Sequence, residues 1–471
     1  MTQQARPLST QSTVAIAGGG LAGLAAACAL SDAGFRVTLF EKRPFLGGRA
    51  SSYEHPGTGE VVDNCPHVLF RVCTNLVEFY KRIGVADQIR WSDQMNFIEP
   101  GGRVSVLRSS ALPAPLHTAP DFWRFPFLSV ADKFAISRAL VPLTLTVQRD
   151  DGLSFQQWLD QHGQTKTPVE RFWRPILISA LSEELDRISV SAAAQVVRES
   201  MKAPAARQMG VPAVPLTALY NAAGDYVRAR GGTIHFRRGV EAFVPEADHV
   251  QVRIADGEEI FDYLVAALPF DALGRILPDD PLSAPLREQI GHFENSPITG
   301  IHLWFDSQIS DLDHAVLLDR TIQWVFHKSR LQPMRSENGM PAGSYIELVV
   351  SSSKTLIEKS RQEIVDLALK EVCEFFPAAR DANLIKATVI KEVNATYSPR
   401  PGIDTHRPGP VTAWPRIFLA GDWTATGWPA TMEGAVRSGY LAAEALARSL
   451  GKEKRFLVPD LKATGLMRIF S

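Results

Sequence analysis

The first regular pattern in the chain is a short apolar run that ends in glycine. Residues 14–17 are apolar, glycines follow at once, and residues 21–30 are rich in Ala and Leu. A short apolar run bounded by a turn signal predicts a buried strand, and a longer Ala/Leu stretch predicts a helix. The order strand, tight turn, helix predicts the opening unit of a layered α/β fold.

Further along, helical and strand patterns alternate, separated by turn residues. A hairpin is expected at 97–107 around a Gly-Gly turn, and residues 121–147 are apolar and aromatic ahead of a helix. Residues 233–269 predict three strands, and 61–75 predict a strand and a turn. The remaining expected helices are 76–83, 155–161, 169–181, 216–231, 355–375 and 430–450, and the remaining strands are 298–305, 344–351 and 386–393.

The turn after the first strand has the pattern Gly18-x-Gly20-x-x-Gly23. Glycines at this spacing allow a tight turn, close approach of the backbone to a pyrophosphate, and close packing of helix on strand. The pyrophosphate is expected at Leu21 and Ala22, because free N–H groups and the helix dipole favour anions there. The segment therefore predicts a dinucleotide site.

An acidic residue and a second glycine pair follow this turn. Glu41 stands at about the spacing expected for a carboxylate that bonds the adenosine ribose hydroxyls, and Lys42 beside it belongs to the expected binding set. Gly48 and the glycine before it let the backbone pass beneath a bound dinucleotide. Arg49 comes next, where it can neutralise phosphate charge or approach a flavin. This second motif favours FAD over NAD.

A segment near the other end of the chain completes the pattern. It reads Phe-Leu-Ala-Gly-Asp-Trp-Thr over 418–424 and Trp-Pro-Ala-Thr-Met-Glu-Gly-Ala over 428–435. Together the motifs resemble the amine oxidase and phytoene desaturase group of flavoproteins, whose signature is G-x-G-x-x-G, an acidic residue and G-G-R. The resemblance predicts an α/β fold: a Rossmann-like FAD-binding domain of this type with an inserted α+β substrate domain.

The same resemblance assigns roles to single residues. Asp422, after Gly421, stands where the group contacts the ribityl chain, and the backbone at Val240 is expected to face the adenine. A helix that opens near Met432 is expected beneath the pyrimidine end of the flavin. Its N-terminus would favour negative charge on the reduced ring by roughly 1 kcal/mol.

The cysteines bear on how the cofactor is held. The chain has four, with no C-x-x-C pair, and none lies beyond Cys373. A thioether link from the C-terminal flavin segment is therefore excluded, and the FAD is expected to be non-covalent unless a histidine holds it. No metal site is expected from these spacings.

The expected domains are discontinuous in sequence. In the resembled group the chain returns to the FAD domain after visiting the substrate domain, so the substrate domain is inserted twice. The expected FAD-binding segments are 12–75, 212–280 and 410–450; the substrate domain is 76–211 and 281–409, with an apolar entry region near 121–147; and 451–471 is a C-terminal tail.

Within the group, the run from Gly421 to Tyr440 looks like hydroxysqualene dehydroxylase. Members of that family use reduced FAD to remove the hydroxyl of hydroxysqualene, giving squalene for hopanoid synthesis. Pro66 is a departure, since a Gln is expected before the histidine. Similar stretches are 63–67, 173–181, 456–461 and 465–468.

The implied reaction requires an acid, because an allylic hydroxyl leaves poorly as hydroxide. His67 is the candidate, with Asp63 as its orienting partner or as an alternative acid. The resulting allylic cation needs a low-dielectric pocket with π faces, and hydride from flavin N5 then quenches it. Each aromatic face can contribute about 0.5–2 kcal/mol. The candidate pocket residues are Phe70, Trp423 and Trp428, and the second-choice acids are Glu183 and Glu184.

Two other functions remain open at this stage. One is an oxidative carotenoid desaturase or a flavin amine oxidase, with hydride passing from substrate to flavin. The other is a non-catalytic prenyl-binding carrier on a similar fold. The chain has no second dinucleotide fingerprint, so electrons must come from a diffusible nicotinamide or another carrier.

Charge and hydropathy predict the partners and the location. The net charge of −1 gives no indication of nucleic-acid binding. An apolar C30 substrate resides in a bilayer, and no uninterrupted apolar stretch is long enough to span one. Basic and apolar side chains, a combination suited to the membrane–water interface, occur together in residues 121–147 and 451–471. We expect a cytoplasmic protein, peripheral on the inner face of a bacterial membrane and associated in function with hydroxysqualene synthase.

Overall fold

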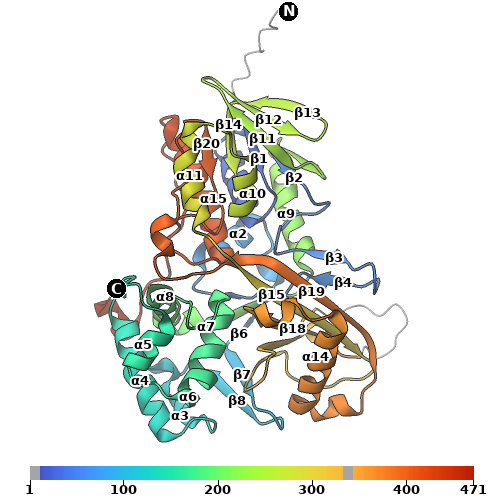
Figure 1. Cartoon of the computed structure of the whole chain (residues 1–471), viewed down its shortest axis with the longest axis vertical. Helices are drawn as coiled ribbons and strands as arrows, with labels where there is room; N and C mark the ends of the chain where they lie inside the picture. Colours follow the sequence, from blue (N-terminus) through green and yellow to red (C-terminus); the bar gives the residue numbers. More distant parts are fainter. Residues whose placement is uncertain (1–10, 333–342, 471) are drawn as a thin grey trace, which may run out of the picture. The chain divides into compact units, whose positions relative to one another are not determined.

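The computed structural model describes residues 11–332 and 343–470 (Figure 1). The chain divides into two compact units, each assembled from separate segments. Among the described residues, the first unit comprises 11–48, 220–292 and 407–458, and the second comprises 49–219, 293–332, 343–406 and 459–470.

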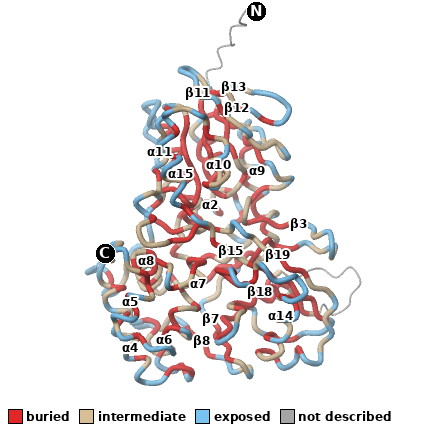
Figure 2. Tube along the Cα trace, in the orientation of Figure 1, coloured by how far each residue is buried: buried red, intermediate tan, exposed pale blue. Residues whose placement is uncertain are grey.

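A five-stranded parallel sheet forms the centre of the first unit, in the order β10-β2-β1-β14-β20. Ile16 of β1 lies between Leu39 of β2 and Val265 of β14, so segments far apart in sequence become neighbours. Figure 2 shows the central strands of this sheet as largely buried, whereas the edge strand β10 is exposed or partly buried. The expected opening strand and helix are confirmed. The bounds are β1 Thr13–Ala17, α1 Leu21–Asp32, β2 Arg36–Glu41, β10 Thr233–Phe236, β14 Tyr263–Ala266 and β20 Ile417–Leu419.

Two small-residue helices pack against each other in this unit. They are α1 and α15 (Met432–Ser449), and all of α1 but its last residue is buried. A Cβ added at Gly439 would lie 2.2 Å from the carbonyl oxygen of Ala22. Only glycine permits this approach, because any side chain would overlap the backbone of the facing helix.

The region 233–269 contains five strands, so the expectation of three is wrong. Besides β10 and β14, it forms an antiparallel meander in the order β11-β12-β13. The segments 246–249 and 255–256 separate the three strands of this meander. The other elements are β11 Val240–Pro245, β12 Val250–Ile254, β13 Gly257–Phe261, α10 Phe270–Ile276 and α11 Ala284–Gly291.

The second unit is built on a seven-stranded mixed sheet, in the order β19-β15-β18-β17-β16-β7-β8. All its pairs are antiparallel except β16 with β7. Helix α14 (Arg361–Phe375) packs its apolar face on this sheet. The bounds are β7 Gln94–Ile98, β8 Val104–Arg108, β15 Asn295–Phe305, β16 His314–Leu317, β17 Trp324–His327, β18 Tyr345–Ser351 and β19 Leu384–Tyr397.

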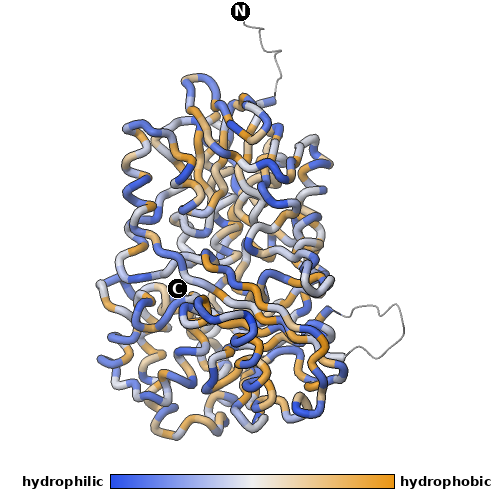
Figure 3. Tube along the Cα trace, turned by 45° about the vertical axis from the view of Figure 1, so that its right-hand side comes forward, coloured by the Kyte–Doolittle hydropathy of each residue, from blue (hydrophilic) through white to orange (hydrophobic). Residues whose placement is uncertain are grey.

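A helical, aromatic-rich subregion contributes a second core to this unit, centred on Trp173, Phe155 and Phe125. Figure 3 shows hydrophobic segments running through the interior of each unit, with hydrophilic ones in the loops. The elements are β3 Ser52–Glu54, β4 Val61–Asp63, β5 Leu69–Phe70, α2 Thr74–Arg82, β6 Ile89–Ser92, α3 Ala119–Arg124, α4 Val130–Leu145, α5 Phe155–Gln161, α6 Lys166–Pro168, α7 Arg174–Leu181, α8 Val190–Met201, β9 Met209–Pro212, α12 Lys328–Leu331 and α13 Lys354–Ile357; α9 Leu216–Arg228 crosses the unit boundary.

Some boundaries differ from expectation for local reasons. The expected helix 355–375 is interrupted, because Ser360 caps a new helix and bonds reciprocally with Glu363. Residues 49–75, 212–219, 281–292 and 407–409 belong to the opposite unit from the one expected. The polypeptide changes unit directly after the second glycine pair, a boundary that carries no compositional signal. Among the described residues, no helix is long and apolar enough to cross a membrane.

Candidate flavin and substrate sites

The first glycine turn is closed by contacts that exclude side chains. Gly18 has φ +106°, and a Cβ there would lie 2.5 Å from the carbonyl oxygen of Ala267. A Cβ at Gly23 would lie 1.9 Å from the carbonyl oxygen of Gly18. Leu21 and Ala22 form the first turn of α1, directly after this bend. The backbone amides at the start of the helix are therefore presented without side-chain cover, as a pyrophosphate requires.

The second glycine pair crosses directly against this turn. Gly47 donates its N–H to the carbonyl of Gly19 at 2.9 Å, and it forms a parallel bridge with Gly20. A Cβ at Gly48 would lie 2.9 Å from the Cα of Gly20. The two glycine motifs thus form one cradle, which a single β-carbon would fill.

The acidic residue is buried at the edge of this cradle. Glu41 is 5% exposed, and its Oε2 accepts the N–H of Gly19 at 2.7 Å. Its Oε1 accepts the N–H of Arg43 at 2.8 Å. A carboxylate has about four acceptor positions, so these bonds orient Glu41 and leave acceptor capacity for ribose hydroxyls.

Lys42 and Val240 lie near Glu41. The carbonyl of Glu41 accepts the N–H of Arg238 at 3.0 Å, and a Cβ at Gly239 would lie 3.1 Å from the Cβ of Lys42. The start of β11 at Val240 therefore runs beside the end of β2. In this unit, the structure brings together Glu41, Lys42, Val240 and the glycine cradle.

The C-terminal flavin segment has its own tight turn. Gly421 has φ +150° and donates its N–H to Ser438 Oγ of α15 at 2.8 Å. Trp423 is 1% exposed and donates its indole N–H to the carbonyl of Leu268 at 2.9 Å. Asp422, between them, is 7% exposed. The turn is thereby attached to both the last helix and the loop after β14.

The helix after this turn begins as expected. Thr431 caps α15 by accepting the N–H of Gly434 at 3.1 Å. Met432 is its first residue, and its sulfur accepts the hydroxyl of Tyr220 at 3.6 Å. Trp428 is 7% exposed, with the Arg437 guanidinium 5.8 Å from its ring centroid. The Arg437 cation therefore already lies near the Trp428 indole, which favours a packing role for Trp428 over stabilisation of a substrate cation.

Asp63, in the second unit, is the anion of a buried ion pair. Its carboxylate accepts bonds from Lys328 Nζ, from Ser52 Oγ at 2.5 Å and from the Leu216 N–H at 3.2 Å. Burial raises the pKa of Asp63, but the charge and hydrogen bond of Lys328 outweigh burial and hold the pKa below its ordinary value. Asp63 is therefore a stable carboxylate and a poor proton donor.

His67 has a different partner from the one expected. Its Nδ1 lies 2.7 Å from the carbonyl oxygen of Cys65, which can only accept, so Nδ1 carries the proton. Burial lowers the pKa of His67, so the ring is neutral with a lone pair at Nε2. The expectation that Asp63 orients His67 is wrong, because Lys328 engages that carboxylate and a backbone carbonyl orients the ring.

The pair between Asp63 and Lys328 continues into a buried cluster that sequence reasoning missed. Glu347 lies 3.5 Å from Lys328 Nζ, and it is cross-strand partner to His302, whose Nδ1 lies 2.8 Å from the hydroxyl of Tyr345. Burial raises the pKa of Glu347 to about 8 and lowers that of His302 to about 3. At neutral pH both are uncharged, so the one lysine balances the one ionised aspartate.

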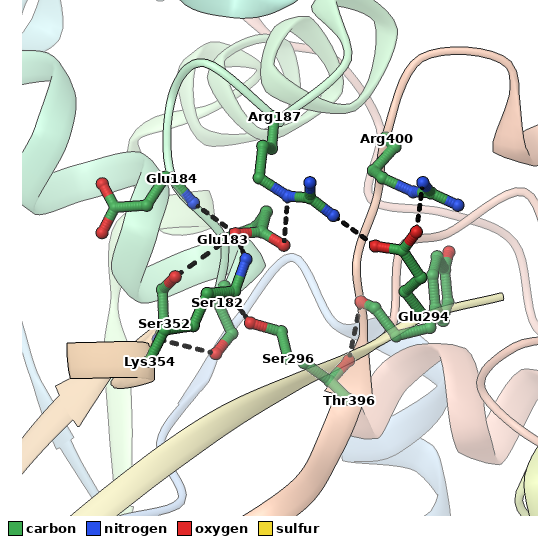
Figure 4. A network of polar contacts seen from close by, with 11 residues as sticks. Ser182, Glu183, Glu184, Arg187, Glu294, Ser296, Ser352, Lys354, Thr396 and Arg400 are labelled. Atoms are coloured by element: carbon green, nitrogen blue, oxygen red, sulfur yellow. Dashed lines mark hydrogen bonds and ion pairs between the residues drawn. The ribbon is translucent and has the colours of Figure 1, made fainter. Parts of the chain in front are cut away.

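The second-choice acids occupy a separate polar network (Figure 4). Glu183 is fully buried and accepts bonds from Lys354 at 2.5 Å and Arg187 at 3.3 Å. Burial raises its pKa, but the Lys354 hydrogen bond and other donors outweigh burial and lower it. Glu184 pairs with Arg174 at 2.7 Å. Glu183 joins the loop after α7 to Lys354 of α13, and Glu184 joins the same loop to Arg174 of α7, which is a structural role.

Two further candidates lie in the second unit. Phe70, on β5, is partly buried against the aromatic core. Arg49 donates to the carbonyl of Ala395 at 2.7 Å, while its own carbonyl accepts from Asn64 at 3.1 Å. Among the described residues, no group of three or more His, Cys, Asp or Glu side chains is arranged to hold a metal.

The sequence profile of a known family, described as flavin containing amine oxidoreductase, matches residues 21–447. This match covers most of the chain, from the first residue of α1 through most of α15, and includes the C-terminal flavin segment. The chain belongs to that family. Its fold class, the Rossmann-like α/β type with an added substrate domain, is confirmed.

Individual relatives agree with this assignment. A probable zeta-carotene desaturase of Synechococcus elongatus is 28% identical, covering 92% of this chain and 98% of that protein. A 15-cis-phytoene desaturase of the same organism is also 28% identical, with 92% and 95% covered. Among solved structures, putrescine oxidase bound to putrescine has a TM-score of 0.71 at 16% identity, covering 94% and 99%. Cyclohexylamine oxidase from Brevibacterium oxydans has 0.66 at 16%, covering 94% and 100%.

This flavoprotein uses FAD, and the first unit fits that group. The fit rests on the glycine cradle, the oriented Glu41 carboxylate and the capped N-terminus of α15. When bound there, FAD supplies hydride-transfer chemistry, while the residues of the unit bind and orient it.

Arg407 is a residue of the flavoprotein that sequence reasoning missed. Its guanidinium donates to the carbonyls of Asp422 at 3.2 Å, Thr424 at 2.5 Å and Trp428 at 2.7 Å. It also donates to the carbonyl of Trp423 at 3.3 Å. One side chain therefore holds much of the C-terminal flavin segment. An arginine just before Pro-Gly-Pro gave no signal, because these carbonyl partners carry no residue-type pattern.

Proposed function

We propose that this flavoprotein is an FAD-dependent oxidoreductase of a long, apolar isoprenoid. The support is its family together with its relatives, which are named as desaturases of phytoene and zeta-carotene and align over nearly the whole chain. Those substrates are long hydrocarbons without charged groups.

Within that class, the proposed reaction is removal of the allylic hydroxyl of hydroxysqualene to give squalene. The run from Gly421 to Tyr440 carries this proposal, since it resembles hydroxysqualene dehydroxylase over twenty consecutive residues. The C–O bond breaks as the hydroxyl leaves as water, a hydride forms the new C–H bond, and reduced FAD is oxidised. An electron donor must then reduce the FAD again, and a hydroxysqualene synthase would supply the substrate.

His67 is the proposed residue for proton transfer in this reaction. Its Nδ1 is engaged by the Cys65 carbonyl, and within the described residues no hydrogen bond to Nε2 is found, so Nε2 is the atom proposed to exchange a proton with a substrate hydroxyl. Because burial keeps the ring neutral, it must take up a proton before it can donate one. Asp63 and Lys328 act on the same segment by holding the end of β4.

Oxidative desaturation of a carotenoid precursor is the second candidate, and the relatives favour it over dehydroxylation. The neutral His67 also suits it, because a desaturase removes a hydride and a proton and a bare Nε2 can accept that proton. In dehydroxylation the hydride passes from the flavin to the substrate, whereas in desaturation it passes from the substrate to the flavin.

One experiment separates the two candidates. Under anaerobic conditions, the protein with reduced FAD is mixed with hydroxysqualene, and the protein with oxidised FAD is mixed with phytoene or zeta-carotene. Squalene formation with reoxidation of the flavin supports the first candidate. A desaturated carotenoid with bleaching of the flavin, and no squalene, contradicts it and supports the second.

The protein is also proposed to act as a peripheral protein on the inner face of a bacterial membrane, where such a substrate resides. Several apolar side chains at the two expected membrane segments are exposed. Phe134 of α4 is 62% exposed, and Ile469 in the tail is 74% exposed. Arg124 and Arg138, near Phe134, would add attraction to anionic lipid, worth about 1 kcal/mol each.

A further inference from the structure

A buried ion pair lies in the first two turns of α15. Glu433 is the second residue of this helix and is fully buried, and Arg437 follows four residues later at 8% exposed. Residues at this spacing lie on the same face of a helix. An oxygen of Glu433 lies 3.6 Å from a guanidinium nitrogen of Arg437. The two charges are therefore close together and largely shielded from solvent.

Further contacts fix the cation of this pair in place. Arg437 Nε donates to the carbonyl of Thr426 at 3.2 Å, and its guanidinium lies 5.8 Å from the ring centroid of Trp428. Both partners belong to the C-terminal flavin segment ahead of α15. The positive charge of Arg437 is therefore held between the helix and that segment.

The position of the pair determines what its charges can do. The N-terminus of α15 is capped by Thr431, and it is where the pyrimidine end of the flavin is expected. The helix dipole places about half a positive charge there, which favours negative charge on the reduced ring. The full negative charge of Glu433 at the same end exceeds it, and buried charges are screened much less than exposed ones. Without a counter-charge, Glu433 would therefore oppose reduction of the flavin.

We propose that Arg437 neutralises Glu433 and thereby keeps the reduction potential of the bound FAD from falling. When a reductant supplies two electrons and the ring takes up one proton, the reduced ring carries one negative charge. The ion pair adds no net charge, so the partial positive charge of the helix end remains available to the reduced ring. This role is distinct from attachment of the segment, because it acts on reduced FAD more than on oxidised FAD.

The test is the midpoint potential of the flavin in the full-length, FAD-loaded protein. It is measured anaerobically, by slow reduction with xanthine and xanthine oxidase beside a reference dye. Arg437→Met should lower the ratio of reduced to oxidised FAD at a fixed potential about tenfold, or about 30 mV for two electrons. Glu433→Gln should raise this ratio about tenfold. The double variant, which again has no net charge at the pair, should lie within about threefold of wild type.

Two further variants make the result specific. Arg437→Lys keeps the positive charge and should retain most of the wild-type potential. Arg448→Met is the matched control, because that arginine is exposed in the last turn of the same helix, and it should leave the potential unchanged. Asp422 and Arg407, charged groups at the same turn, are present in every variant, so a difference between variants reports on the pair.

Opposite shifts in the two single variants, with the double variant near wild type, would support the proposal. A purely structural role predicts weaker FAD binding in both single variants, without potential shifts of opposite sign. Shifts in the same direction, or no larger than that of Arg448→Met, would overturn the proposal. If Arg437→Met does not fold because Glu433 is left unpaired, the other variants still decide. A potential in Glu433→Gln no higher than in the double variant would then overturn it.

Discussion

At the scale of the residue, His67 is the group whose role is most directly testable. If its Nε2 transfers the proton, His67→Phe should retain FAD and slow the reaction by roughly 10²–10⁴-fold, the usual range for a lost general acid or base. The measurement is the single-turnover rate of flavin reoxidation or bleaching. His162→Phe, which removes a histidine stacked on Trp158, is the control. A His67 variant within a few-fold of wild type would leave the histidine a packing role only.

Glu347 predicts a pH dependence of stability. Burial raises its folded pKa to about 8, above the ordinary 4.5, so the folded state holds a proton that the unfolded state has lost between these values. The contribution of Glu347 to the free energy of unfolding is therefore complete below pH 4.5. It declines as pH rises towards 8, by at most about 1.4 kcal/mol per pH unit. Glu347→Gln should flatten this decline in urea unfolding between pH 5.5 and 8. An unchanged slope would show that Glu347 is ionised in the folded protein.

At the scale of the element, Arg407 holds the turn that precedes α15. Arg407→Ala should weaken FAD binding about tenfold to a hundredfold, because charge-assisted bonds contribute about 1.5–3 kcal/mol. The dissociation constant is measured by flavin fluorescence with the apoprotein. Arg416→Ala is the control, since Arg416 bonds the carbonyls of Ala247 and Asp262 elsewhere in the same unit. Recovery of binding with added guanidinium would confirm the role, and equal effects of both variants would contradict it.

The elements show what sequence can predict. The strand, turn and first helix follow from local signals, namely apolar periodicity and glycines whose positive φ or close contacts exclude other residues. The partners of Asp63 do not follow from local signals, because Lys328 lies 265 residues away in the sequence and reaches the carboxylate only in the folded chain. The motif residues of the first unit come together around the glycine turn, and their contacts with FAD stay a prediction. The contacts that fix protonation at His67 and Asp63 required the structure.

At the scale of the whole molecule, the flavin should be bound without a covalent link. Acid precipitation should release the yellow colour into the supernatant, because the chain has no cysteine beyond Cys373 to form a thioether. The absorbance of supernatant and pellet is the measurement. Colour that stays with the pellet would point to a covalent bond, with a histidine as the first candidate.

Membrane attachment is tested by flotation with anionic liposomes. The full chain should float, less so at high salt, and Ile469→Ser with Phe134→Ser should reduce the floating fraction because both side chains are largely exposed. Val244→Ser, on the exposed side of β11, is a control of similar hydrophobicity. Equal recovery of all three proteins in the soluble fraction at low salt would exclude these segments as anchors.

The packing of Gly439 on Ala22 has a consequence for synthesis on the ribosome. Helix α1 emerges early, but α15, which packs against it, is made only after roughly 400 further residues, so the apolar surface of α1 stays uncovered during that time. At about 5–20 residues per second this interval is on the order of 20–80 s. The second unit is almost entirely translated within that time. The first unit is therefore the last to close, and a chaperone bound to the nascent chain should be found at α1.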